Sequence, residues 1–193
     1  AIVLTAQTPF DKVLGVSNLK LLKYEWIWDK EVGTGFLNAK KMPLKSHENI
    51  LVFYKKKPIY NPQMTNANPK NIRPLTTSEQ TSSNYGKVEK VKASEDYDVT
   101  KRYPKSVIPF SKNSGELNSL KRIHPTQKPI SLFEYLIKTY TNENMIVLDN
   151  CIGSGTTAIA CINTNRNYIG FEMDEEYYDK ALQRMEDRLK NYK

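Results

Sequence analysis

The chain has 193 residues, enough for one domain with a sizeable core and an inserted lobe. It contains no apolar run near the roughly 20 residues that span a bilayer, and its two cysteines, Cys151 and Cys161, have no metal-site spacing. The first observation excludes a membrane segment, and the second argues against a metal site. The scarcity of cysteine indicates a cytoplasmic protein, and the net charge of +8 indicates a polyanionic partner.

The excess positive charge lies in the middle of the chain. Residues 55–128 carry 15 Lys and Arg against 6 Asp and Glu, whereas residues 1–54 carry 7 against 5 and residues 129–193 carry 7 against 10. Such a segment favours a nucleic-acid partner, since each cation set against a phosphate releases a counterion. A solvated insertion that binds nothing would carry the same charges, so this alternative stays open.

The first third of the chain alternates short apolar runs with one helical pattern. We predict one helix and three strands, at Phe10–Leu22 and at Ala1–Thr5, Tyr24–Asp29 and Ile50–Tyr54. Trp26 and Trp28 share one face of the second strand. Tryptophans in such a position belong to the core more often than they stack on a base, so we predict a core role for both. Because a strand begins at once with no leader, we expect the chain to be cut from a longer one.

Residues 61–122 are rich in Asn, Ser, Thr, Pro and Lys and show little periodicity. A structureless loop of this length is uncommon inside a compact domain unless it is functional or disordered. We therefore predict an inserted lobe between residues 1–60 and residues 123–193.

The last third returns to a strong alternation of strands and helices. An apolar stripe from Leu132 to Tyr140 predicts a helix, with Pro129 suited to its first turn. Further elements are predicted at Met145–Leu148, Thr156–Ile162, Tyr168–Phe171 and Glu175–Leu189. This alternation indicates βαβ units and a mostly parallel sheet.

A glycine turn lies between the predicted strand at Met145–Leu148 and the predicted helix at Thr156–Ile162. The strand ends at Asp149, and Gly153 and Gly155 precede the helix. The third glycine of a dinucleotide site and the Lys of a P-loop are both missing. A carboxylate here would repel a pyrophosphate and attract a cation, such as the sulfonium or ammonium of S-adenosylmethionine (SAM). Glu172 follows 23 residues later, the separation at which an acid reaches ribose hydroxyls.

The motif His124-Pro125-Thr126-Gln127-Lys128-Pro129 comes just before this unit. In this order the segments resemble the cofactor half of the β-class SAM-dependent DNA amino-methyltransferases, which methylate adenine N6 or cytosine N4. Residues 24–30 and 47–54 resemble the strands that follow the catalytic motif in that class. The resemblance implies a three-layer, Rossmann-like α/β fold with an incomplete sheet, in which residues 61–122 recognise the target.

The resemblance also implies roles for single residues. Asp149 would hold the methionine ammonium, Glu172 the ribose hydroxyls, and Thr126 and Lys128 the methionine carboxylate, although Lys128 alone could be a surface charge. Cys151 stands where the family usually has Phe. The predicted cofactor site comprises Thr126, Lys128, Asp149, Cys151, Gly153, Ser154, Gly155, Thr156 and Glu172.

Double-stranded DNA is the partner that the resemblance implies. We predict contacts from a set of basic residues within and beside the insertion, namely Lys55, Lys56, Arg73, Lys101, Arg102, Lys105, Lys121 and Arg122. His47 and Glu48 are equally consistent with a buried structural pair and with a role near the target base.

The catalytic motif of the family, Asp/Asn-Pro-Pro followed by an aromatic residue, is missing. The chain has no Pro-Pro pair, so no catalytic residue can be nominated. We expect a fragment of a longer enzyme that methylates adenine N6, with cytosine N4 second. Alternatives are a half completed by another segment or by a second copy, an inactive DNA-binding module or subunit, and an RNA methyltransferase.

Overall fold

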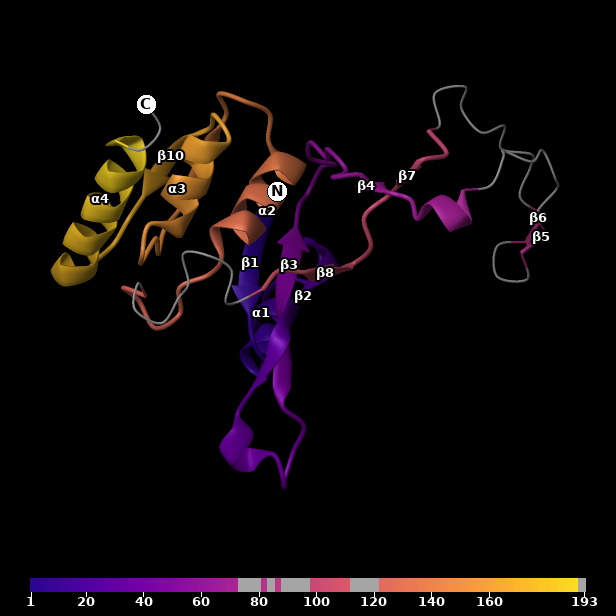
Figure 1. Ribbon diagram of the computed structural model, residues 1–193, viewed down its shortest axis with the longest axis horizontal. Helices are drawn as coiled ribbons and strands as arrows, with labels where there is room; N and C mark the ends of the chain where they lie inside the picture. Colours follow the sequence, from indigo (N-terminus) through magenta and orange to yellow (C-terminus); the bar gives the residue numbers. More distant parts are fainter. Residues whose placement is uncertain (73–80, 83–85, 88–97, 112–121, 191–193) are drawn as a thin grey trace. The chain divides into compact units, whose positions relative to one another are not determined.

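The computed structural model (Figure 1) separates into two compact units, residues 1–61 with 105–193 and residues 62–104. The structure describes residues 1–72, 81–82, 86–87, 98–111 and 122–190. Two residues predicted to contact DNA, Arg73 and Lys121, lie outside the described residues.

The larger unit contains a four-stranded sheet. Its order is β1 (Ile2–Ala6), β3 (Lys45–Phe53), β2 (Leu22–Thr34) and β8 (Val107–Pro109). Both β1 and β2 run antiparallel to β3, and β8 is parallel to β2. This sheet is mostly antiparallel, since a hairpin joins β2 to β3, whereas parallel pairing was predicted from the last third of the chain. β8 pairs with this sheet although it falls within residues 61–122.

The last third forms the predicted βαβ unit. Its strands β9 (Ile146–Asp149) and β10 (Asn167–Gly170) are parallel and are joined by α3 (Thr156–Asn163). Before and after it lie α2 (Ile130–Tyr140) and α4 (Glu175–Lys190). Each element lies within two residues of its predicted bounds. No helix in the described ranges is long and apolar enough to cross a bilayer.

The first helix is shorter than predicted. α1 (Phe10–Ser17) ends at Asn18, whose side-chain oxygen and carbonyl both accept a hydrogen bond from the Leu21 amide. Asparagine competes for backbone donors in this way and so favours a turn over another helical turn. The turn frees the following residues to begin β2 at Leu22.

The main core lies between the sheet and α2. Trp26 and Trp28 of β2 are buried with Ile50 of β3 and Leu132 of α2, which confirms their prediction as core residues. Trp26 Nε1 donates to the hydroxyl of Tyr140 at 2.7 Å, so the polar edge of this ring is also satisfied. Burying an indole with its N–H paired is what makes tryptophan an effective core residue.

The smaller unit consists of short paired segments. β4 (Thr65–Asn66) pairs with β7 (Lys101–Arg102), β5 (Thr81–Ser82) pairs with β6 (Gly86–Lys87), and the 3₁₀ turn η2 spans Pro69–Asn71. The guanidinium of Arg102 donates to three carbonyls of the same unit, those of Val99, Lys101 and Asn71. These bonds give Arg102 a structural role within the unit.

Candidate cofactor-binding site

Asp149 occupies the carboxyl end of β9, where it pairs in register with Gly170 of β10. One carboxylate oxygen accepts the Cys151 amide at 3.1 Å, and the other accepts the Thr157 hydroxyl at the start of α3. These two bonds fix the side chain at the mouth of the turn. Because a carboxylate can accept about four hydrogen bonds, half of its capacity remains for a ligand.

Glu172 follows the end of the neighbouring strand β10. Its carboxylate accepts the amides of Met173 and Gly153 at 2.9 Å and that of Asp174 at 3.0 Å. These backbone hydrogen bonds, that from Asp174 foremost, lower the pKa of Glu172 below its ordinary value. The side chain is therefore ionised at neutral pH, and its bond to Gly153 ties the two strand ends together.

The glycines of the turn are needed for its backbone geometry. Gly153 and Gly155 have φ of +52° and +73°, in the left-handed region that favours glycine. A Cβ on Gly155 would also lie 3.3 Å from Cβ of Ala181 in α4. On β10, a Cβ on Gly170 would overlap the end of the Ile152 side chain, so this third glycine allows the turn to lie over the strand.

The polar side chains inside the turn point into the protein. Ser154 and Thr156 are buried, and their hydroxyls lie 3.1 Å apart. Arg184 of α4 donates to the Ser154 carbonyl at 2.7 Å and to the Thr156 hydroxyl at 3.2 Å. The side chains of Ser154 and Thr156 are therefore turned away from a ligand, which could meet only their backbone atoms. The side chain of Cys151 is exposed and accessible to a ligand.

The segment before α2 packs against this turn. His124 lies 3.7 Å from the position that a Cβ on Gly153 would take, and its ring contacts Tyr177 with centroids 4.4 Å apart. The Thr126 amide and hydroxyl both lie within hydrogen-bond distance of His124 Nδ1, at 3.2 and 3.0 Å. Thr126 is exposed, so its hydroxyl is accessible beside the turn.

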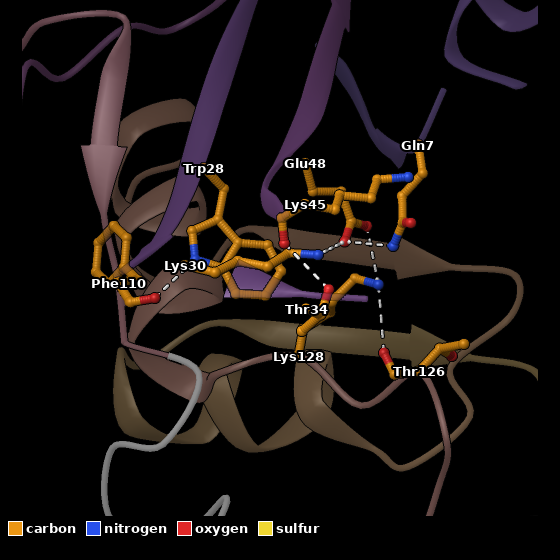
Figure 2. A network of polar contacts seen from close by, with 9 residues as sticks. All are labelled: Gln7, Trp28, Lys30, Thr34, Lys45, Glu48, Phe110, Thr126 and Lys128. Atoms are coloured by element: carbon orange, nitrogen blue, oxygen red, sulfur yellow. Dashed lines mark hydrogen bonds and ion pairs between the residues drawn. The ribbon is translucent and has the colours of Figure 1, made fainter. Parts of the chain in front are cut away.

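Figure 2 shows a buried ion-pair cluster that links this segment to the sheet. The Glu48 carboxylate of β3 lies 3.0 Å from Nζ of Lys128 and 2.9 Å from Nζ of Lys30. It also accepts a hydrogen bond from Nε2 of the Gln7 side chain at 3.0 Å. Burial raises the pKa of Glu48, but the charge of Lys128 and the hydrogen bonds from both lysines outweigh it, so the net shift is downward. The Glu48 carboxylate is therefore charged and paired.

The pairing answers two questions about these residues. Lys128 is ion-paired and mostly buried, so it is no ordinary surface charge. His47 is exposed while Glu48 is buried, so the two do not form a buried pair. The role of Lys30 was not foreseen. The signal available in the sequence was Glu48 itself, an acid two residues before the apolar run that begins at Ile50.

The described residues predicted to contact DNA belong to both compact units. Lys55 and Lys56 are exposed just after β3, and Lys105 is exposed before β8. Lys101 and Arg102 belong to the smaller unit, where Lys101 donates to Asn66 at 2.6 Å. Arg122 is half-buried at the start of the segment that leads to α2.

The donor set suits a ligand that is cationic at one end and carries hydroxyls. Asp149 and Glu172 present ionisable oxygens at the ends of adjacent parallel strands, where ligands of open α/β sheets lie. Lys128 retains 18% exposure of its side chain despite its ion pair. No group of acids, His and Cys that could hold a metal occurs among the described residues.

Comparison with known proteins agrees with this geometry. The sequence model of the DNA methylase family N6_N4_Mtase matches residues 12–183. The chain is 39% identical over 89 residues to the type II methyltransferase M.HpaI of Haemophilus parainfluenzae, a match that covers 46% of this chain and 28% of that protein. It is 44% identical over 64 residues to the putative methylase YubD of Escherichia coli K12, covering 33% of this chain and 28% of that one.

Solved structures match over more of the chain. The M1.HpyAVI–SAM complex has a TM-score of 0.61 at 27% identity, covering 95% of this chain and 72% of that one. The cytosine-N4-specific PvuII DNA methyltransferase has a TM-score of 0.64 at 16% identity, covering 98% and 68%, and supports the Rossmann-like methyltransferase fold alone. The matches to M.HpaI and YubD each cover less than a third of the length of that relative. Since the family model covers most of the chain, the protein belongs to the DNA methylase family of the N6/N4 type.

Proposed function

We propose that this chain is the SAM-binding half of a DNA amino-methyltransferase that methylates adenine N6. The observation that carries the proposal is the placement of Asp149 and Glu172 at the ends of two adjacent parallel strands, around a left-handed glycine turn. The M1.HpyAVI structure, of similar fold, was solved with SAM bound.

Each end of SAM has a suitable group in this chain. Asp149 would accept hydrogen bonds from the methionine ammonium. Glu172 would bind the ribose through the one acceptor position that its three backbone bonds leave free. Thr126 and Lys128, beside the first turn of α2, would bind the methionine carboxylate. The backbone from Cys151 to Thr156 would line the space between them.

Bound SAM supplies an electrophilic methyl group on a sulfonium. Transfer to an exocyclic amine breaks the carbon–sulfur bond, forms a carbon–nitrogen bond and releases one amine proton. The residues of this chain hold and orient the donor, which removes much of the entropic part of the barrier. The groups that position the amine belong to the Asp/Asn-Pro-Pro-aromatic motif, which does not occur in this sequence.

Two other readings compete with adenine methylation. Cytosine N4 is the second acceptor, because the matched family is of the N6/N4 type and transfer to cytosine makes the same demand on the cofactor half. An inactive module that binds duplex DNA would use the same basic residues without transfer. We propose duplex DNA as the macromolecular partner, and a complementing segment or second copy as the source of the missing motif.

Mass spectrometry of DNA nucleosides tests the proposal. Duplex DNA is incubated with methyl-deuterated SAM and either residues 1–193 or a chain with whatever the gene encodes before Ala1. We expect deuterated N6-methyladenine only with the longer chain. Deuterated N4-methylcytosine would select the second acceptor, and duplex binding with no labelled base from either chain would select the inactive module.

A further inference from the structure

The β2–β3 hairpin extends past both strands that flank it. β1 pairs with β3 over Asn49–Phe53, and β8 pairs with β2 over Ile27–Asp29. The pairing of β2 with β3 continues to Thr34 and Lys45, and the 3₁₀ turn η1 (Phe36–Asn38) lies at the tip. Residues 30–48 therefore form a two-stranded projection from the sheet (Figure 1).

The tip of this projection is ordered by its own backbone. Gly35, with φ of +90°, begins the turn and accepts the amide of Asn38 at 2.9 Å. The carbonyl of Asn38 accepts the amide of Lys41 at 2.8 Å, and the Thr34 hydroxyl donates to the Lys45 carbonyl at 3.0 Å. The side chains of Phe36 and Leu37 make none of these bonds, so their apolar character calls for another explanation.

Those side chains are apolar and displayed to solvent. Phe36 is 81% exposed and Leu37 is 98% exposed, with Met42 and Leu44 also exposed behind them. Residues 32–46 contain three lysines, Lys40, Lys41 and Lys45, and no acid. A partner for this tip must be anionic and must also offer apolar surface. Duplex DNA does both, through its phosphates and through its base and sugar edges.

The base of the hairpin adjoins the proposed cofactor site. Lys30 on β2 and Glu48 on β3 are ion-paired there, and Glu48 also binds Lys128 of the segment before α2. The projection therefore begins at the ion pair that holds a segment of the proposed cofactor site.

We propose that the tip of the β2–β3 hairpin is a DNA-binding surface, in which Phe36 and Leu37 contact base or sugar edges and Lys40 and Lys41 contact phosphates. The identity of the partner rests on the proposed function. Lys55 and Lys56 follow the opposite end of β3 and are not part of this surface.

Fluorescence anisotropy with a labelled mixed-sequence duplex, across a sodium chloride series, tests the surface in the full chain. Lys40→Gln/Lys41→Gln should reduce the slope of log K against log salt by about 1.8, at about 0.9 per phosphate contact. Phe36→Ser/Leu37→Ser should raise Kd about tenfold with an unchanged slope, the lower range for loss of a base–aromatic contact. Leu19→Ser/Lys20→Gln, an exposed pair of the same types after α1, is the matched control and should bind like wild type.

Wild-type affinity and slope in both tip variants would overturn the proposal. So would altered self-association in sedimentation velocity with unchanged DNA binding, which would assign the tip to contact between copies. Melting temperatures should match wild type, since the replaced side chains are exposed. The duplex assay uses no cofactor, so a failure of S-adenosylhomocysteine to bind in a separate titration would count against the proposed function and not against the tip.

Discussion

Nζ of Lys128 lies 3.0 Å from the carboxylate of Glu48, and the two side chains are 18% and 3% exposed. The same carboxylate holds Lys30, so one acid balances two largely buried cations. Glu48 stands at the beginning of the buried part of β3, whereas Lys128 stands two residues before α2. This ion pair therefore fixes the segment before α2, part of the proposed cofactor site, to the inner strand β3.

Glu48→Gln should destabilise the protein strongly. The change leaves two lysines in the interior without their counter-charge, and breaking a buried pair in this way typically costs about 3–5 kcal/mol. Urea denaturation measures the effect. Glu176→Gln is the matched control, because Glu176 pairs with Lys180 on the exposed face of α4 and should cost about 0–1 kcal/mol. Equal losses in the two variants would contradict a special role for the Glu48 cluster.

The cost of Glu48→Gln should depend on pH. Folding lowers the pKa of Glu48, so the stability that its charge contributes is present above its unfolded pKa of about 4.3 and is lost as pH falls through the lower folded value. The difference in unfolding free energy between wild type and variant should be constant from about pH 7 to 5 and shrink below about pH 4. A difference that grows as acid is added would refute this ionisation state.

Gly170→Ala should distort the turn over β10. Its Cβ would overlap Cδ1 of Ile152 and lie 3.3 Å from the Ile152 Cβ, and overpacking of this kind costs about 1–3 kcal/mol. Ile152→Val removes the overlapping atom. We therefore expect the double variant to lose less unfolding free energy than the two single variants lose together. Strict additivity in thermal unfolding would show that the two residues do not meet.

Lys55 and Lys56 remain predicted phosphate contacts. Both are exposed just after β3. Replacing both by Gln should reduce the salt slope of duplex binding by about 1.8, whereas Lys138→Gln on α2 should leave the slope unchanged. A wild-type slope in the double variant would place the interface elsewhere.

Arg102→Gln should destabilise the smaller unit, because its guanidinium is bonded to carbonyls there.

The last third of the fold was predictable because its signals are local. The glycine turn, the apolar stripe of α2 and the alternation of strands and helices each lie within a short window of sequence. β8 was missed since it has three residues, one of them Pro109, and exists through its pairing with β2. Its neighbour Ser106 accepts the amide of Ile27 at 2.8 Å, a contact that no local pattern reveals.

The site was predictable in part for the same reason. Asp149 ends one strand of the βαβ unit and Glu172 lies two residues after the other, so parallel pairing places both at the same end of the unit. The cluster of Lys30, Glu48 and Lys128 could not be predicted, because its members come from distant parts of the chain and meet only in the folded unit. The hydrogen bonds from Arg184 of α4 to the Ser154 carbonyl and the Thr156 hydroxyl likewise join distant parts of the chain.

Binding of the cofactor product tests the central proposal most directly. Isothermal titration of residues 1–193 with S-adenosylhomocysteine should show weak binding, and Glu172→Ala should raise Kd by about 10- to 100-fold, as expected for loss of a charge-assisted hydrogen bond of about 1.5–3 kcal/mol. Asp179→Ala, which removes an exposed acid from α4, should bind like wild type. Circular dichroism confirms that both variants fold. The same Kd for wild type and a folded Glu172→Ala variant would contradict the assignment of this turn as the SAM site.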